Sequence, residues 1–163
     1  MTVRYSLWQS FRAAGRGLQD AVWSQRNMRV HAALAALVTV MAVWLELPVA
    51  ETAAVVIAMA VVLAAELFNS ALEILVDLVV GSEYHVLAGR AKDVGAAAVL
   101  VTAAGAAIAG LLVLGRRVLA GLSGGAVDAL LLGRAGALLL VLTLVVVVLR
   151  RPERQPGHNG GSE

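Results

Sequence analysis

The chain has 163 residues, of which 60% are hydrophobic and 15% are charged, and its formal net charge is +2. Its mean hydropathy of +0.85 is too high for a soluble domain of this size, so the composition indicates a membrane protein. The absence of Cys excludes disulfides and thiolate metal sites. The arginines gather at the ends of apolar segments, which is typical of membrane topology and argues against nucleic-acid binding.

The N-terminal segment, residues 1–29, is basic and lacks the apolar core of a secretory signal peptide, so we do not expect one. Its large apolar residues recur at spacings of three and four, which predicts an amphipathic helix lying in the membrane interface. These residues are Trp8, Phe11, Leu18 and Val22, with Gly15 on the same face. Glycines weaken helix propensity, so a frayed basic leader is the alternative.

Three apolar segments follow, at residues 30–47, 53–80 and 94–114, and each is long enough to cross a bilayer. The second would reach roughly 42 Å as a helix, whereas a hydrocarbon core is about 30 Å thick. We therefore expect its C-terminal turns to emerge from the hydrocarbon, or the helix to tilt. Small residues in the third segment predict close packing between helices. A polar linker, residues 81–92, joins the second and third segments.

The C-terminal part, residues 116–151, combines a Gly-rich connector with an almost purely Leu and Val run at residues 135–149. This run predicts a fourth transmembrane helix, although its short length leaves a re-entrant or surface helix as the alternative. Residues 152–163 are polar and are expected to be disordered. The sequence thus predicts an all-α polytopic membrane protein in which residues 30–115 form a three-helix core.

The distribution of Lys and Arg predicts the orientation of the chain. With four spans, ten of these residues fall on the side of the N-terminus and three on the opposite side. The positive-inside rule then places the N-terminus in the cytoplasm. The linker at residues 81–92 would face the cytoplasm as well, where nucleotides are available.

Polar residues interrupt the second apolar segment on one helical face only. Glu66, Asn69, Glu73 and Asp77 fall within an arc of about 80° at the helical step of 100° per residue. An ionised group within a bilayer costs several kcal/mol, so such residues usually have a function. The structural alternative is that Glu66 pairs with an arginine or a neighbouring helix. We expect Asp77 to be an anchor in the headgroup region and not part of the site.

The depths of the two glutamates suggest a division of chemical roles. Counted from residue 53, Glu66 lies about 20 Å along the helix and Glu73 about 30 Å along it. A carboxylate at the first depth can accept a proton from a lipid hydroxyl, and one at the second depth can hold a hard cation beside a cytosolic polyphosphate. Together these functions describe a phosphoryl transfer, to which Lys92 and Asp93 would add a phosphate partner and another acid.

Three segments resemble the prokaryotic diacylglycerol kinase family, which includes undecaprenol kinases. They are RNMRVH at residues 26–31, AELFNSALEILVDLV at residues 65–79 and GSEYHVLAGRAKDVGAAAVLV at residues 81–101. The resemblance covers roughly residues 8–115, and residues after about 116 have no counterpart in the family's three-helix form. It implies a homotrimeric, multi-pass kinase of the bacterial cytoplasmic membrane, with sites between subunits, that transfers the γ-phosphoryl group of MgATP to diacylglycerol.

The resemblance also implies roles for individual residues. By similarity, Glu66 is the general base, Glu73 binds ATP and Mg²⁺, and Asn69 organises the ATP site. The remaining ATP-binding positions are Glu83, Tyr84, His85, Lys92 and Asp93. Weaker similarity places Asn27, Arg29, His31 and Trp44 beside the lipid substrate.

One departure from the family concerns the metal. Gln25 stands where the family usually has a second metal-ligating Glu, so one negative charge is missing from the cation's surroundings. An inactive membrane relative is therefore one alternative. Undecaprenol is the alternative substrate, because the RNMRVH segment resembles the undecaprenol kinase branch. A transporter or channel is disfavoured, since all the acids lie on one helix without a matching broken helix.

Overall fold

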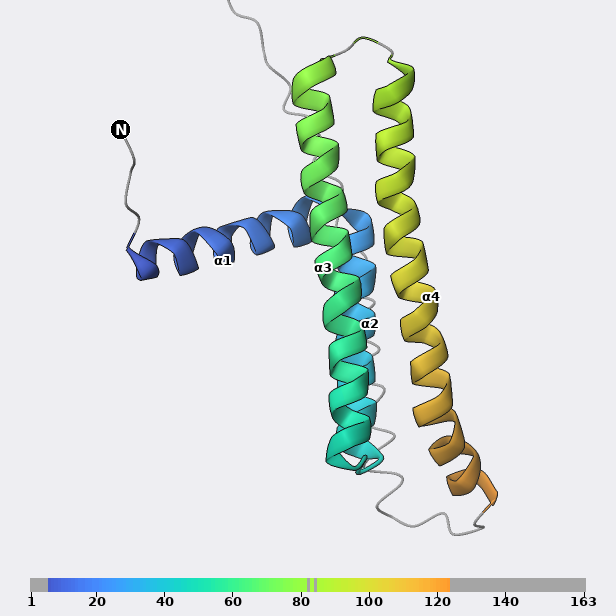
Figure 1. Cartoon of the computed structure of the whole chain (residues 1–163). Helices are drawn as coiled ribbons and strands as arrows, with labels where there is room; N and C mark the ends of the chain where they lie inside the picture. The colour runs from blue at the N-terminus through green and yellow to red at the C-terminus, as the bar shows by residue number, and fades with distance from the viewer. Residues whose placement is uncertain (1–5, 82, 84, 124–163) are drawn as a thin grey trace, which may run out of the picture.

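A computed structural model describes residues 6–81, 83 and 85–123, and within these ranges the chain is entirely helical (Figure 1). Its helices are α1 (Leu7–Ser24), α2 (Arg26–Trp44), α3 (Val49–Val80) and α4 (Val86–Ser123). Three of these elements are long and apolar enough to cross a membrane, namely α2, α3 and residues 86–119 of α4. The predicted all-α polytopic membrane fold is thus confirmed. The predicted fourth transmembrane helix and the polar tail lie outside the described residues.

Helix α1 extends crosswise from the bundle formed by α2, α3 and α4 (Figure 1). It begins with a capping box, in which the backbone N–H of Gln9 donates to Ser6 Oγ at 3.3 Å and the backbone N–H of Ser6 donates to Gln9 Oε1 at 2.9 Å. A single extended residue, Gln25, separates α1 from α2. The exposed apolar side chains of α1 are Leu7, Trp8, Phe11, Leu18 and Trp23.

A short connection folds α2 back onto α3. The Leu47 amide donates to the carbonyl of Ala42, and the Glu46 amide donates to that of Val43, which is the bonding pattern of a Schellman motif. Glu46 occupies the left-handed conformation that this motif requires, with a φ of 50°. Pro48 then precedes α3, whose first residue lies one turn earlier than the sequence predicted.

The second connection, between α3 and α4, is shorter than the predicted linker at residues 81–92. Gly81 ends α3 with a φ of 63°, a conformation that costs glycine little. Helix α4 begins at Val86, so Lys92 and Asp93 lie on a helix and not in a loop. At its other end α4 continues through the predicted boundary at residue 116. There the Arg117 guanidinium forms an ion pair with Glu51 at 3.5 Å.

The packing between the helices follows one stripe on each element. On α3 the stripe contains Val55 and Val62, and it continues seven residues later into Asn69, which is also buried. On α4 the buried Val99 and Ala106 are likewise seven residues apart. The polar residues of α3 therefore occupy positions that would otherwise belong to the apolar core.

Helix α2 is shorter than α3, so one part of the bundle contains α2, α3 and α4 and another part contains only α3 and α4. Helix α2 has 19 residues and α3 has 32, which correspond to about 28 Å and about 48 Å. The two are joined at one end, so α3 and α4 continue beyond the start of α2 at the other end, where α1 leaves the bundle (Figure 1).

Candidate functional site

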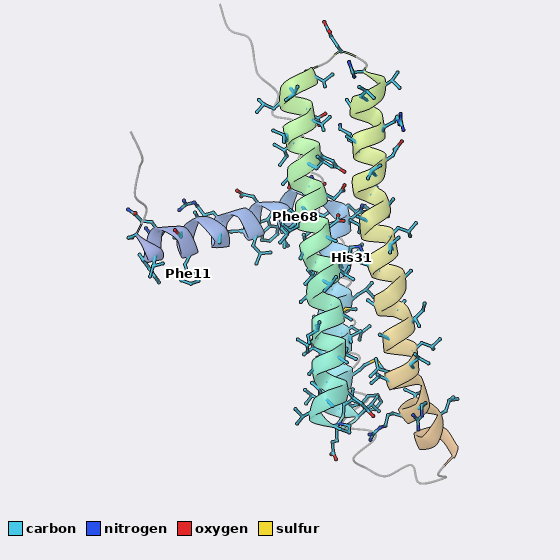
Figure 2. The ribbon with its side chains drawn as sticks, in the orientation of Figure 1. Phe11, His31 and Phe68 are labelled. Atoms are coloured by element: carbon cyan, nitrogen blue, oxygen red, sulfur yellow. The ribbon has the colours of Figure 1, made fainter. Side chains whose placement is uncertain are left out.

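Glu66 is the most buried acidic residue that the structure describes, with 2% of its surface exposed. Its Oε2 atom is buried and has no hydrogen-bond partner among the described residues. His31 of α2 lies close enough for a Coulombic interaction with Glu66, and Figure 2 shows His31 on α2 beside α3. A buried carboxylate oxygen without a donor is costly, so this oxygen is suited to receive a proton or a donor from a ligand.

Asn69 and Glu73 form a hydrogen-bonded pair one helical turn further along α3. The Asn69 Nδ2 amide donates to Glu73 Oε1 at 2.9 Å, a bond strengthened by the carboxylate charge. This bond fixes the orientation of the amide, and Asn69 Oδ1 is left buried without a partner in the described part of the chain. Two unpartnered acceptor oxygens, from Glu66 and Asn69, thus lie on neighbouring turns of one helix.

Lys92 reaches α3 from the second turn of α4. Its Nζ atom lies 2.6 Å from Asp77 Oδ1, and both side chains are partly exposed. The sequence interpretation assigned Lys92 to phosphate binding and left Asp77 outside the site. The structure joins the two, so Asp77, which lies on the predicted acidic face of α3, contacts a predicted site residue. The sequence contained one indication of this contact: Asp77 and Lys92 are 15 residues apart, on opposite sides of the turn between two antiparallel helices.

The helix start at Val49 changes the depths that were predicted for the acidic residues. Counted from Val49, Glu66 lies about 26 Å along α3 and Glu73 about 36 Å along it. Both positions are about 6 Å further than the sequence suggested. Since α2 is about 28 Å long, Glu66 lies level with the first turns of α2, and Glu73 lies beyond them.

The other predicted nucleotide contacts are at the open end of the bundle. Glu83 and His85 lie in the connection between α3 and α4, and both are exposed. Asp93 is exposed on α4. Tyr84 lies outside the described residues. Each of these assignments remains a prediction.

The predicted lipid-flanking residues divide between the two ends of α2. Asn27 is exposed on the first turn of α2. Arg29 has a buried Nε atom, and Trp44 a buried Nε1 atom, that lack partners among the described residues. Trp44 lies about 20 Å along α2 from His31, so these two residues cannot contact the same lipid headgroup. Gln25, the predicted metal position, is half-buried at the junction of α1 and α2.

Gly95 is a second residue that the sequence interpretation did not assign to the site. It lies on α4 directly against Asn69, and an added Cβ would come within 3.0 Å of Leu72 Cδ2 and closer still to Asn69 Oδ1. Sequence reasoning treated the glycines of this segment alike, as packing residues. Gly105 and Gly110 have open space at the same point, so only the structure separates them from Gly95.

The acidic residues of the site provide few ligands for a divalent cation. Within the described ranges, no three acidic or histidine side chains converge as they would in an all-protein metal site. A Mg²⁺ ion that arrives with a nucleotide needs only one or two protein carboxylates, because phosphates and water complete its octahedron. Glu73, with the unpartnered oxygens of Glu66 and Asn69 nearby, meets that smaller requirement.

The chain is similar in sequence to a family of known proteins. Residues 12–114 match the family model of the prokaryotic diacylglycerol kinases. The chain is 40% identical over 115 residues to a diacylglycerol kinase of Synechocystis, and this match spans 66% of each chain. It is 38% identical over 94 residues to a diacylglycerol kinase of Escherichia coli, spanning 58% of this chain and 70% of the relative.

A third relative is named for a different lipid substrate. An undecaprenol kinase of Bacillus subtilis is 37% identical over 106 residues, a match that spans 65% of this chain and 85% of the relative. The polar face of α3 and the Lys92 position both lie inside the segment that the family model matches. The chain therefore belongs to the prokaryotic diacylglycerol kinase family.

Proposed function

We propose that this protein is a membrane lipid kinase that transfers the γ-phosphoryl group of ATP to the hydroxyl of diacylglycerol, giving phosphatidic acid and ADP. The observation that carries the proposal is the buried, unpartnered Oε2 atom of Glu66, one turn from Asn69 and two turns from Glu73, which are hydrogen-bonded to each other. Membership of a family whose relatives are named as diacylglycerol and undecaprenol kinases supports it.

Glu66 is the general base in this proposal. It lies level with the first turns of α2, close enough to His31 for a Coulombic interaction, and the lipid hydroxyl is placed there. Glu66 accepts the hydroxyl proton as the lipid oxygen forms its bond to the γ-phosphorus. The bond between that phosphorus and the β–γ bridging oxygen breaks, and ADP leaves with the bridging oxygen.

The nucleotide occupies the part of α3 and α4 beyond the start of α2. Lys92 supplies a positive charge to the phosphates, and Glu83 with His85 is available to the nucleoside end. Glu73 and the carbonyl oxygen of Asn69 would hold Mg²⁺, with Gln25 as a weaker candidate. When bound there, the ion would neutralise negative charge on the nucleotide phosphates. The hydrogen bond from the Asn69 side-chain amide keeps the Glu73 carboxylate oriented toward this site.

The assembly and topology complete the proposal. Met28 is the only large side chain that is fully buried in the described part of the chain, so one subunit encloses little. A homotrimer with sites between subunits would shield the polar face of α3 from lipid. The protein lies in the bacterial cytoplasmic membrane with its N-terminus in the cytoplasm, because Arg and Lys gather on that side.

Undecaprenol is the second candidate substrate. The Bacillus subtilis relative named undecaprenol kinase is matched over 85% of its length, a larger share than in the diacylglycerol kinases. His31 lies beside Glu66, where it meets the hydroxyl end of either lipid, so the Glu66 chemistry is the same for both substrates.

The test is phosphorylation of defined lipids by the purified full-length protein. The protein in detergent micelles receives labelled ATP, Mg²⁺ and either diacylglycerol or undecaprenol, and the labelled lipid is identified. Labelled phosphatidic acid supports the proposal, and labelled undecaprenyl phosphate moves it to the second substrate. If neither lipid gains label while Gln25→Glu does restore transfer, the chain is an inactive relative.

A further inference from the structure

We propose that Gly95 is a positioning residue for the catalytic site: the absence of its side chain leaves the space that Asn69 Oδ1 needs in order to hold its amide toward Glu73. This inference deepens the proposed function and rests on it. It starts from the close approach of α3 and α4 at one point along their contact.

The contact at Gly95 involves a functional group and not an ordinary core side chain. Asn69 Oδ1 and Leu72 Cδ2 are the two atoms nearest to the place where a Cβ of residue 95 would stand. Asn69 is 93% buried and its Nδ2 donates to Glu73 Oε1 at 2.9 Å. The amide therefore has a polar partner on one side and the bare backbone of α4 on the other.

A methyl group at position 95 could be accommodated by rotation of the Asn69 side chain, and this rotation would disrupt the site. Contacts below 3.0 Å force a movement, and the far end of a side chain moves more easily than a packed helix. The Asn69 amide would rotate away from Gly95, and its Nδ2 could no longer remain on Glu73 Oε1. The fold would survive while Glu73 lost the donor that orients it.

Other glycines on α4 do not share this arrangement. Gly105 and Gly110 lie on the same helix, and a Cβ at either position would meet nothing within 4 Å. Replacing them with Ala has the same effect on helix propensity as replacing Gly95. They therefore control for the change in helix propensity and lack the contacts with Asn69 and Leu72.

The experiment compares Gly95→Ala and Gly105→Ala in the full-length protein. We expect Gly95→Ala to raise the KM for MgATP at least about tenfold, the factor for loss of one charge-assisted hydrogen bond, and to change the KM for lipid less than about twofold. Gly105→Ala should keep both constants. Equal KM values for MgATP in the two variants would overturn the inference.

Two further variants separate the role of Asn69 from helix packing. In an Asn69→Ala background, Gly95→Ala should cause no additional loss and should fold even if the single variant does not, because the obstructed atom is gone. A failure of this pair to fold, or a full additional loss, would contradict the proposal. Leu72→Ala should not rescue Gly95→Ala; a rescue would mean that the contact only affects packing.

A spectroscopic readout keeps the inference separate from the proposed activity. The side-chain amide resonance of Asn69, identified by its disappearance in Asn69→Ala, should shift in Gly95→Ala and in Glu73→Gln and stay in place in Gly105→Ala. If wild-type protein phosphorylates neither lipid, the proposed function fails, yet this shift still tests the positioning of Asn69. If the lipid is phosphorylated and the resonance does not move, only the inference about Gly95 fails.

Discussion

The ion pair between Lys92 and Asp77 allows the two roles of Lys92 to be separated experimentally. In the structure Lys92 Nζ lies 2.6 Å from Asp77 Oδ1, whereas the proposed function requires the same ammonium group to contact nucleotide phosphates. If Lys92 serves only to join α3 and α4, substitution of Lys92 and substitution of Asp77 should have equal effects on nucleotide affinity. If Lys92 leaves Asp77 for the phosphates when nucleotide binds, the two substitutions should have different effects.

The size of each effect follows from the exposure of the pair. The two side chains are 38% and 64% exposed, so the pair contributes only about 0.2–1 kcal/mol to folding. Lys92 can therefore leave Asp77 at little cost, and Asp77→Asn should increase the affinity for MgATP by no more than about fivefold. A hydrogen bond between Lys92 and a phosphate is worth about 1.5–3 kcal/mol, so Lys92→Met should reduce that affinity by about 10-fold to 150-fold.

The assay is titration of the detergent-solubilised protein with MgATP, followed by binding and by initial rates. Arg90→Gln is the matched control, because it removes one positive charge from the same helix at an exposed position. The double variant of Lys92 and Asp77 should behave like Lys92→Met alone. Equal losses in Asp77→Asn and Lys92→Met would refute the reasoning and leave Lys92 as a link between helices.

Three further outcomes follow from the described contacts. Glu66→Gln should lower kcat at least about 100-fold with the KM for MgATP nearly unchanged, and full retention of kcat in a lipid phosphorylation assay would remove Glu66 as the base. Gln25→Glu should lower the Mg²⁺ concentration needed for half-maximal rate, since it restores a carboxylate; an unchanged Mg²⁺ titration would place Gln25 outside the metal site. Arg117→Ala should lower the free energy of unfolding by less than about 1 kcal/mol in a thermal melt, because the pair with Glu51 is partly exposed, and a larger loss would indicate additional contacts.

The hydrophobic segments of the sequence predicted the transmembrane helices but did not predict the residues at which those helices begin and end. The three apolar runs predicted α2, α3 and α4, because length and composition decide whether a segment can cross a membrane. Both ends of the hairpin between α2 and α3 depend on local bonding around Glu46 and Pro48, which hydropathy does not detect. For the same reason the start of α4 at Val86 was missed, and Lys92 was expected at the end of a linker.

The candidate site was predictable where it lies on one helix and less so where it joins two. Helical spacing alone brought Glu66, Asn69 and Glu73 to one face, and the structure places all three on the same face of α3. Contacts between α3 and α4 depend on the register of the hairpin, which one sequence does not fix. The sequence therefore did not place Asp77 and Gly95 in the site, although each lies against a predicted site residue of the other helix.

The single residue between α1 and α2, Gln25, connects the depth of Glu66 in the membrane to the position of α1. One residue, Gln25, ends α1 and precedes α2, so the position of α1 restricts where the first turns of α2 can lie. Helix α2 is about 28 Å long, close to the thickness of about 30 Å of a hydrocarbon core. If α1 lies in the membrane interface, as its sequence predicts, a thinner membrane would tilt α2 and shift Glu66, beside His31, relative to the lipid hydroxyls.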